Sequence, residues 1–335
     1  MGKGSILRII ITMKNHRISA RRLFKKLPFK IILAVFALII LLVVVFFSRK
    51  PVVLVTGKAF TVLYGEKRSR FKQISLSLRL FRPVKTIAIA EGAGADLVTQ
   101  GALSLSRQPF AVFFPYRYRE AAWRYQNNRP GSRVVVLAGR KARENDYGSE
   151  NNSQGSTAIS EAMSGLPLWI NTDSETDLYR AGALAGIYTQ HEKQNRGIAL
   201  FYEGLNYEEK AAFVAGLDDQ QWDGSPSYSP DLTETDLSCA VILENFRFGE
   251  EGKAGSLILF TWMDPALAPR KTLAIFDDSP WAQISPAMEI IKKGRHGTLI
   301  PSEITILRGD KTKKDVYNEI NRLKILKKRA ENADN

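Results

Sequence analysis

Residues 110–138, FAVFFPYRYREAAWRYQNNRPGSRVVVLA, decide the fold class of this chain. The apolar runs FAVFFP (110–115) and RVVVLA (133–138) flank a helical pattern over 117–128 that ends in a Pro-Gly turn. Continuous apolar runs, rather than alternating ones, are typical of strands that are covered on both faces. A helix between two such strands predicts a crossover connection and therefore a parallel sheet.

The same alternation continues on both sides of this stretch. Upstream we expect strands over 51–56 and 85–90 and helices over 66–80 and 94–106. Downstream, residues 141–160 are polar and rich in Asn, Ser and Gly, which predicts a surface loop, and PLWIN at 167–171 predicts another strand.

A second α/β unit of similar size follows, starting with a helix that Asp173 or Ser174 would cap. The expected strands lie at 196–202, 240–243, 256–261, 272–276 and 303–307, and the expected helices at 174–191, 207–220, 286–293 and 311–330. The last helix carries an apolar stripe, for which we weigh packing on a lobe against partner binding. Because parallel sheets bind ligands outside the carboxyl ends of their strands, two such units predict a cleft between two lobes.

Residues 31–47, IILAVFALIILLVVVFF, contain no charge, no Gly and no Pro. We expect an uncleaved transmembrane helix over 31–48, the alternatives being a buried core helix or a cleaved signal peptide. Residues 1–30 hold nine Lys and Arg and no acid, which favours a cytoplasmic N-terminus. The expected location is the bacterial inner membrane, crossed once, with the C-terminal body on the periplasmic side.

The charge of the chain is unevenly distributed. Residues 1–85 hold nineteen of the 48 basic residues and one acid, for a net of +18, whereas residues 86–335 have a net of −4. A basic excess around an apolar helix indicates anionic membrane lipids as a partner. No basic stripe stands out on the expected folded body, so we expect no nucleic acid partner.

Few motifs suggest catalysis or metal binding. Cys239 is the single cysteine, which excludes an intramolecular disulfide, and the three histidines lie far apart in the sequence. The turn EGAGAD over 91–96 resembles a phosphate-binding loop in its context, but Leu97 stands where a third glycine belongs, so a tight turn is favoured. We expect no metal, no cofactor and no enzyme activity; a hydrolase or transferase is a minor alternative.

Four segments carry a resemblance to a known family: DLYRAGALAG (177–186), RGIALFY (196–202), KAAFVAGL (210–217) and DDSPWAQISPAMEIIKKG (277–294). The chain resembles the type I periplasmic binding proteins, nearest to their basic membrane protein and sugar-binding branches. The resemblance covers roughly residues 51–310 and implies two Rossmann-like lobes that close on a ligand. Two departures are the missing lipid-anchor cysteine and the missing cytoplasmic output domain.

The expected organisation follows from these points. It consists of a basic cytoplasmic tail (1–30), the membrane helix (31–48), a first lobe (51–172), a second lobe (173–276), a crossover and hinge (277–310), and a basic C-terminal helix and tail (311–335).

Side chains at the expected strand ends are the candidate ligand residues. Aromatic rings would stack on a sugar or base, and carboxylates would accept hydrogen bonds from hydroxyl groups. The candidates are Phe114, Tyr116, Asp173, Tyr202, Glu203, Trp262, Asp277 and Asp278.

Two functions from different classes fit these expectations. The first is capture or sensing of a small polar ligand, nucleoside- or sugar-like, on behalf of a membrane transporter or receptor. The alternative is a structural or interaction protein of the cell envelope that retains the fold without a ligand. An open cleft lined by Asp173, Tyr202 and Asp277 would favour the first, and a cleft filled by Phe114 or Trp262 would favour the second.

Overall fold

The computed structural model describes residues 29–105, 107–139, 167–191, 197–201, 205–229, 237–243, 254–293 and 299–307. The chain divides into two compact units, Met1–Lys50 and Pro51–Asn335. In the first unit, helix α2 spans Phe29–Ser48, and its large apolar side chains are exposed, Phe36 by 61% and Phe47 by 65%. Over the described part of the chain, no helix reaches the length and apolarity that a membrane crossing requires. The transmembrane helix expected over 31–48 therefore stays a prediction.

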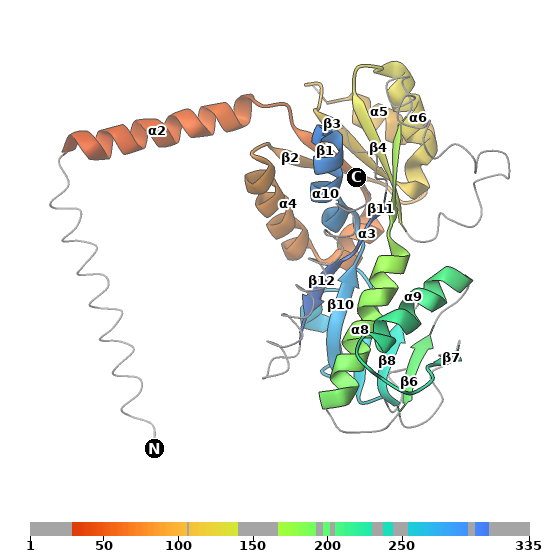
Figure 1. Cartoon of the computed structure of the whole chain (residues 1–335). Coiled ribbons are helices and arrows are strands. Elements are labelled where there is room, and N and C mark those ends of the chain that lie inside the picture. Colours follow the sequence, from red (N-terminus) through yellow and green to blue (C-terminus); the bar gives the residue numbers. More distant parts are fainter. Residues whose placement is uncertain are drawn as a thin grey trace. The chain divides into compact units, whose positions relative to one another are not determined.

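The second unit contains two six-stranded sheets, each forming the centre of one lobe (Figure 1). The first-lobe sheet has the order β11-β5-β4-β3-β1-β2, and its neighbouring strands are parallel. All six residues of β1 are buried, as expected for a continuous apolar run between two helical layers. The strands are β1 (Val52–Gly57), β2 (Val84–Ile89), β3 (Ala111–Pro115), β4 (Arg133–Gly139), β5 (Leu168–Thr172) and β11 (Leu299–Ile300).

Helices cover both faces of the first-lobe sheet. Leu54 and Phe113 face α3 (Lys58–Tyr64), α4 (Glu66–Leu80) and α10 (Pro280–Lys293) in one hydrophobic cluster. Val53 and Val55 face α5 (Ala95–Leu103) and α6 (Arg119–Asn128) in another. Successive residues of β1 thus point to opposite layers, which explains why the strand has no polar face.

The second-lobe sheet repeats this plan with the order β12-β10-β9-β8-β6-β7. Its neighbours are parallel except for β12, which runs antiparallel to β10. The strands are β6 (Gly197–Phe201), β7 (Ser227–Ser229), β8 (Leu237–Ile242), β9 (Ser256–Phe260), β10 (Thr272–Asp277) and β12 (Glu303–Ile306).

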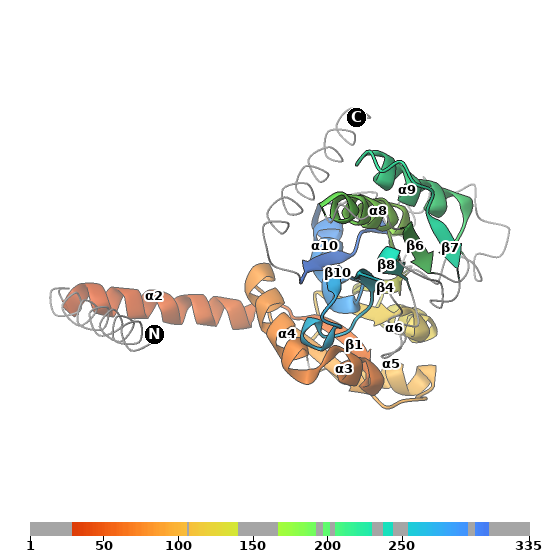
Figure 2. The same cartoon turned by 90° about the horizontal axis from the view of Figure 1, so that it is seen from below.

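Helices α8 (Ser174–His191) and α9 (Tyr207–Asp218) lie side by side on the second lobe (Figures 1 and 2). A Cβ atom on Gly182 would lie 2.2 Å from the carbonyl oxygen of Phe213, and one on Gly216 would lie 2.0 Å from that of Tyr179. The two backbones therefore touch, and only glycine fits at these two points. The Ala- and Gly-rich segment 177–186 therefore includes a helix contact.

The chain passes between the lobes three times. It leaves the first lobe between β5 and α8, returns between β10 and α10, and leaves again between β11 and β12. The last passage is held by Asp177 of α8, which is fully buried and accepts a hydrogen bond from the backbone N–H of Ser302 at 2.9 Å. The lobes are thus made of interleaved segments.

The structure corrects several sequence expectations. The helix expected over 286–293 begins at Pro280 instead and carries Pro286 inside it. A proline is well accommodated in the first turn of a helix, and we wrongly took the second proline as the start. The short elements α3, β7 and β11 were not expected at all. The loop at 141–160 and the helix at 311–330 lie outside the described residues.

Candidate functional site

Six of the eight candidate ligand residues lie within the described part of the chain, and Tyr202 and Glu203 lie outside it. Phe114 is fully buried, with its ring centroid 5.9 Å from that of Tyr125 of α6. Asp173 accepts hydrogen bonds from the backbone N–H of Thr176 at 3.1 Å and from its hydroxyl at 2.7 Å. As placed, Phe114 serves the core and Asp173 caps α8.

Asp277 ends β10 in the second lobe and is bound by two side chains of the first lobe. Arg68 of α4 donates to its carboxylate at 2.9 Å, and the hydroxyl of Tyr64 of α3 donates at 3.2 Å. The backbone N–H of Ser279 adds a third hydrogen bond at 2.9 Å. Asp277 is only 1% exposed, so it joins the lobes rather than facing an open cleft.

Arg68 makes further contacts across the same junction. It donates to the backbone carbonyls of Trp262 at 2.9 Å and Met263 at 2.7 Å, after the end of β9. Its guanidinium lies 3.9 Å from the ring centroid of Tyr64. Lys72, one turn further along α4, pairs with Glu303 of β12 at 2.5 Å. Two successive turns of α4 therefore bind the second lobe through Arg68 and Lys72.

Asp278 and Trp262 form another group in the second lobe, which is more exposed to solvent than Asp277. The indole N–H of Trp262 donates to Asp278 at 2.7 Å, and the hydroxyl of Thr172 from β5 donates to the same carboxylate at 3.2 Å. Trp262 is 36% exposed and packs edge-on against Phe60 of α3, with ring centroids 5.5 Å apart. An exposed ring beside a carboxylate is suited to a hydroxylated ligand.

The first lobe contributes a strand-end cluster that the sequence analysis missed. Glu91 follows β2, and Arg117 follows β3 and donates to Glu91 at 2.9 Å and to the hydroxyl of Tyr118 at 2.5 Å. The backbone N–H of Ala59 donates to the other Glu91 oxygen at 3.3 Å. Glu91 and Arg117 are both about half exposed and present charge to solvent. They occupy the same strand-end position as the chosen candidates, so the same criterion applied to every charged residue would have found them.

Tyr116 lies beside this cluster, directly after β3. Its ring centroid lies 6.1 Å from that of Trp169 of β5. The guanidinium of Arg119 lies over the Tyr116 ring, 4.4 Å from the ring centroid. Tyr116 is partly exposed, unlike Phe114 two residues before it. Of the two aromatic candidates at the end of β3, Tyr116 is the one in a position to touch a ligand.

The start of α3 joins the two groups. Ala59 contacts Glu91 of the first-lobe cluster through its N–H, and the next residue, Phe60, contacts the ring of Trp262. The exposed groups from the two sheets are therefore neighbours across two residues of α3. The structure thus brings Trp262, Asp278 and the missed pair Glu91 and Arg117 to one edge.

The two carboxylates of interest differ in their electrostatics. Burial is the main cause that raises the pKa of Asp277, and the hydrogen bonds from Ser279 and the charge of Arg68 oppose it. The hydrogen bond from Arg117, with a smaller contribution from the Ala59 N–H, lowers the pKa of Glu91. Burial, followed by the charge of Asp277, raises the pKa of Tyr64, so its hydroxyl keeps the proton that it donates.

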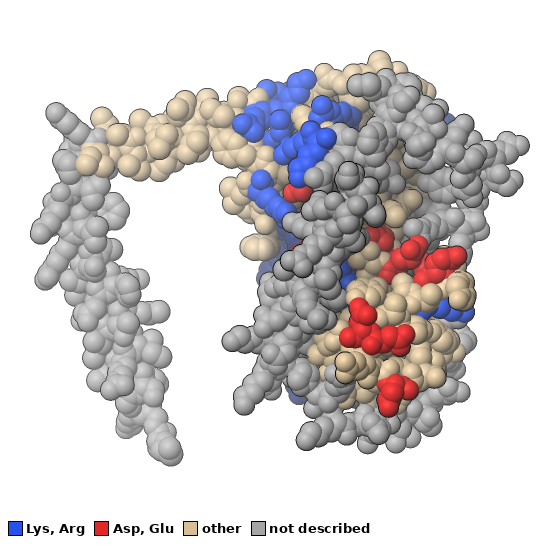
Figure 3. Space-filling model, in the orientation of Figure 1, with Lys and Arg blue, Asp and Glu red and all other residues tan. Residues whose placement is uncertain are grey.

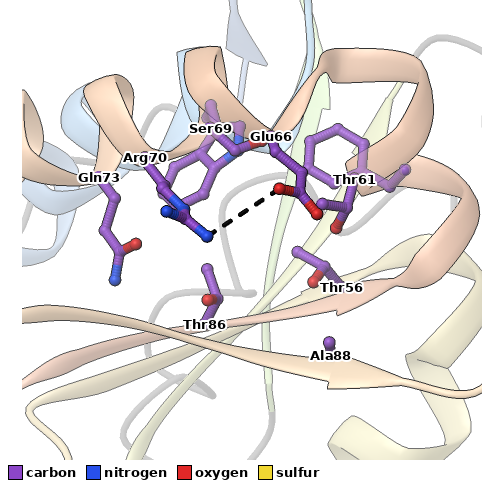
Figure 4. Close-up of a pocket in the computed structure, with 10 residues that line it drawn as sticks. Thr56, Thr61, Glu66, Ser69, Arg70, Gln73, Thr86 and Ala88 are labelled. Atoms are coloured by element: carbon purple, nitrogen blue, oxygen red, sulfur yellow. Dashed lines mark ion pairs between the residues drawn. The ribbon is translucent and has the colours of Figure 1, made fainter.

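A groove of about 210 Å³ lies beside this edge, between α4 and strands β1 and β2 (Figure 4). Glu66, Arg70 and Gln73 of α4 face Thr56 and Thr86 across it. Trp281 and Ser69 also line the groove, and their indole N–H and hydroxyl are buried with no hydrogen-bond partner among the described residues. Its size suits a few water molecules or a very small polar solute.

The described residues contain no cluster of three or more His, Cys, Asp or Glu side chains that could hold a metal ion. The edge presents the guanidinium of Arg117, the carboxylates of Glu91 and Asp278, and the partly exposed rings of Trp262 and Tyr116. Such groups bind hydroxyl-bearing or zwitterionic solutes through hydrogen bonds and stacking.

The comparisons with known proteins bear on the fold. No family model and no curated protein matches the sequence. Among solved structures, an ABC transporter solute-binding protein from Conexibacter woesei superposes with a TM-score of 0.52 at 14% identity, over 85% of this chain and 97% of that one. The resemblance to periplasmic binding proteins is thereby confirmed at the level of the two-lobed α/β fold.

Two other solved structures are less similar. A transcriptional activator from Bacillus halodurans has a TM-score of 0.46 at 9% identity, over 82% of this chain and 96% of that one. An ABC transporter periplasmic solute-binding protein from Actinobacillus succinogenes, with bound D-allose, has a TM-score of 0.44 at 10% identity, over 79% and 100%.

Proposed function

We propose that residues from Pro51 onward capture a small polar solute at the edge where the strands of both sheets end. The observation that carries this proposal is the junction at α3, where Ala59 meets Glu91 and Phe60 meets Trp262. Through it, the charged pair of the first lobe and the exposed ring and carboxylate of the second lie next to each other. The fold shared with a solute-binding protein supports the same function.

The proposed ligand is hydroxylated, in the manner of a sugar or a nucleoside. Arg117 would donate to its oxygens, Glu91 and Asp278 would accept from its hydroxyls, and Trp262 or Tyr116 would stack on its ring. Asp277 has no part in this site, because Arg68, Tyr64 and Ser279 already bind its carboxylate.

A melting-temperature screen of purified protein against sugars, nucleosides, amino acids and short peptides tests this proposal. A ligand at 100 times its dissociation constant stabilises the folded state by about 2.7 kcal/mol, which is a shift of a few degrees. The matched variant is Arg117→Ala, which should fold and show about half of the shift or less, because tenfold weaker binding leaves the ligand at only about ten times its dissociation constant. If every compound leaves the melting temperature of the parent protein unchanged, solute capture is contradicted.

We also propose that α2 holds this module at the bacterial inner membrane, with the N-terminus in the cytoplasm and the body in the periplasm. Support comes from its uncharged run at 31–47, from the exposure of side chains such as Phe36, and from the nine basic residues in 1–30. A transporter or receptor in the same membrane would receive the solute. Recovery of the full chain in carbonate-washed membranes, with the body digestible only after the periplasm is opened to protease, is the expected result.

A second candidate function is favoured by the junction at Asp277. Arg68 and Lys72 tie the lobes together through buried and half-buried contacts, and Phe114 fills the core at the end of β3. This arrangement suits an interaction protein of the cell envelope that keeps the fold without opening it. Such a protein would melt cooperatively, and none of the tested compounds would change its melting temperature. It would be recovered with a protein partner after cross-linking.

A further inference from the structure

The outward face of α4 is apolar. Phe71, Ile74 and Leu78 are exposed by 70%, 61% and 69%, and their spacing of three and four residues places them in one stripe. The opposite side of the helix carries Leu76 and Leu80, which are 6% exposed and belong to the core. The surface face of a helix is normally polar, so a stripe of three large apolar side chains marks a docking surface.

Basic residues surround this stripe. The segment from Glu66 to Lys85 contains seven Lys and Arg and one acid. Arg68 and Lys72 are engaged with the second lobe, whereas the side chains of Arg70 and Arg79 are 79% and 66% exposed. Figure 3 shows Lys and Arg gathered over the first lobe and Asp and Glu over the second. Positive charge around an apolar stripe complements an anionic lipid surface.

The chain's connectivity favours the same partner. Helix α2 ends at Ser48, and β1 begins at Val52, which pairs with Val84 of β2, the strand that follows α4. Four residue steps span at most about 14 Å. If α2 is inserted in a bilayer, the first residue of β1 therefore lies within that distance of the last residue of α2.

We propose that the outward face of α4 docks on the anionic surface of the membrane that holds α2, with Phe71, Ile74 and Leu78 at the level of the head groups. This inference rests on the proposed membrane anchor. Docking would hold the first lobe against the bilayer and leave the second lobe, whose described surface is more acidic, away from it. The solute-binding edge would then keep a constant orientation to the membrane.

Site-directed fluorescence of the full chain in lipid vesicles tests the proposal. A single cysteine is introduced as Ile74→Cys, Leu38→Cys or Gln100→Cys and labelled with a polarity-sensitive dye; native Cys239 is fully buried, and labelling of the parent chain checks that it stays unmodified. Leu38 reports α2, and Gln100 is an exposed control on α5. Quenching by nitroxide-labelled lipid is then measured in vesicles rich in phosphatidylglycerol.

We expect strong quenching at positions 38 and 74 and little at 100, with quenching at 74 alone reduced several-fold in high salt or in purely zwitterionic vesicles. Quenching at 38 without quenching at 74 overturns the docking and leaves the anchor standing. No quenching at any position shows that the anchor itself has failed. A dye at 74 that is shielded from iodide but not quenched by lipid shows that a protein covers the stripe, which also overturns the proposal.

Discussion

Asp277 and Glu91 both lie at strand ends and both accept a hydrogen bond from an arginine at 2.9 Å, yet their surroundings are opposite. Asp277 is 1% exposed and joins the lobes, whereas the side chain of Glu91 is 57% exposed. Removing one partner of a buried charge pair is strongly destabilising, because the other charge is left buried without a partner. An exposed pair costs little to break and can exchange its partner for a ligand. Burial therefore separates the carboxylate that holds the fold from the one that suits binding.

The largest effect that this comparison predicts is that of Arg68→Ala. The change leaves the carboxylate of Asp277 buried with only Tyr64 and Ser279 as donors, and it frees two backbone carbonyls. We expect a loss of about 3–5 kcal/mol in the free energy of unfolding, measured by urea denaturation.

Arg70→Ala is the matched control for that measurement. Arg70 lies on the same helix, but its side chain is 79% exposed, and among the described residues it forms one ion pair, with Glu66 at 3.9 Å. We expect a change within about 0.5 kcal/mol. Similar losses in the two variants would show that the junction at Asp277 contributes no more than a surface pair.

A smaller effect is expected at the exposed pair. Arg117→Ala should weaken binding of whichever solute stabilises the parent chain by about tenfold or more, because it removes a charged hydrogen-bond donor. Folding should be almost unaffected. Titration calorimetry of the purified variants gives both affinity and stoichiometry.

The control for this prediction is Arg124→Ala. Arg124 is exposed to a similar degree, 42% against 44%, and also pairs with two side chains, Asp96 and Glu120, but it lies within α6 rather than at a strand end. Its loss should leave affinity unchanged. Equal losses of affinity in both variants would refute the assignment of the strand-end edge.

The smallest predicted effect concerns pH. Because Arg117 lowers the pKa of Glu91, the folded chain binds this proton less readily than the unfolded chain does. The stabilisation is therefore complete above the ordinary value of about 4.3 and is lost as the pH falls through the lowered pKa. Carboxyl NMR should show the pKa of Glu91 rising in Arg117→Ala, and an unchanged value would show that the hydrogen bond does not form in solution.

Much of the fold followed from local pattern. Apolar runs such as 51–56 and 133–138 became buried parallel strands because helices on both faces leave no position for a polar side chain. The elements that were missed are those formed by distant contacts. The two residues of β11 are a strand only because they pair with β5, and α3 carries Thr61 and Val62, whose branched side chains are more typical of strands.

The site was less predictable for a related reason. Sequence position places Phe114, Asp277 and Glu91 alike at strand ends, but exposure depends on which side chains arrive from elsewhere. Arg68 lies 209 residues before Asp277. No sequence pattern around Arg68 indicates that its guanidinium would bind the Asp277 carboxylate. Chemical type and position in the chain therefore placed the candidates at strand ends, while the division between buried and exposed side chains required the three-dimensional contacts.

The three passages of the chain between the lobes have a consequence for biosynthesis. The first-lobe sheet is complete only when β11 joins β5, and its core only when α10 supplies Trp281 and Met288. Asp177 similarly waits for Ser302, 125 residues later. Neither lobe can reach its final packing before the ribosome has released its missing strands. The body is therefore expected to fold as one cooperative unit, late in synthesis, rather than lobe by lobe from the N-terminus.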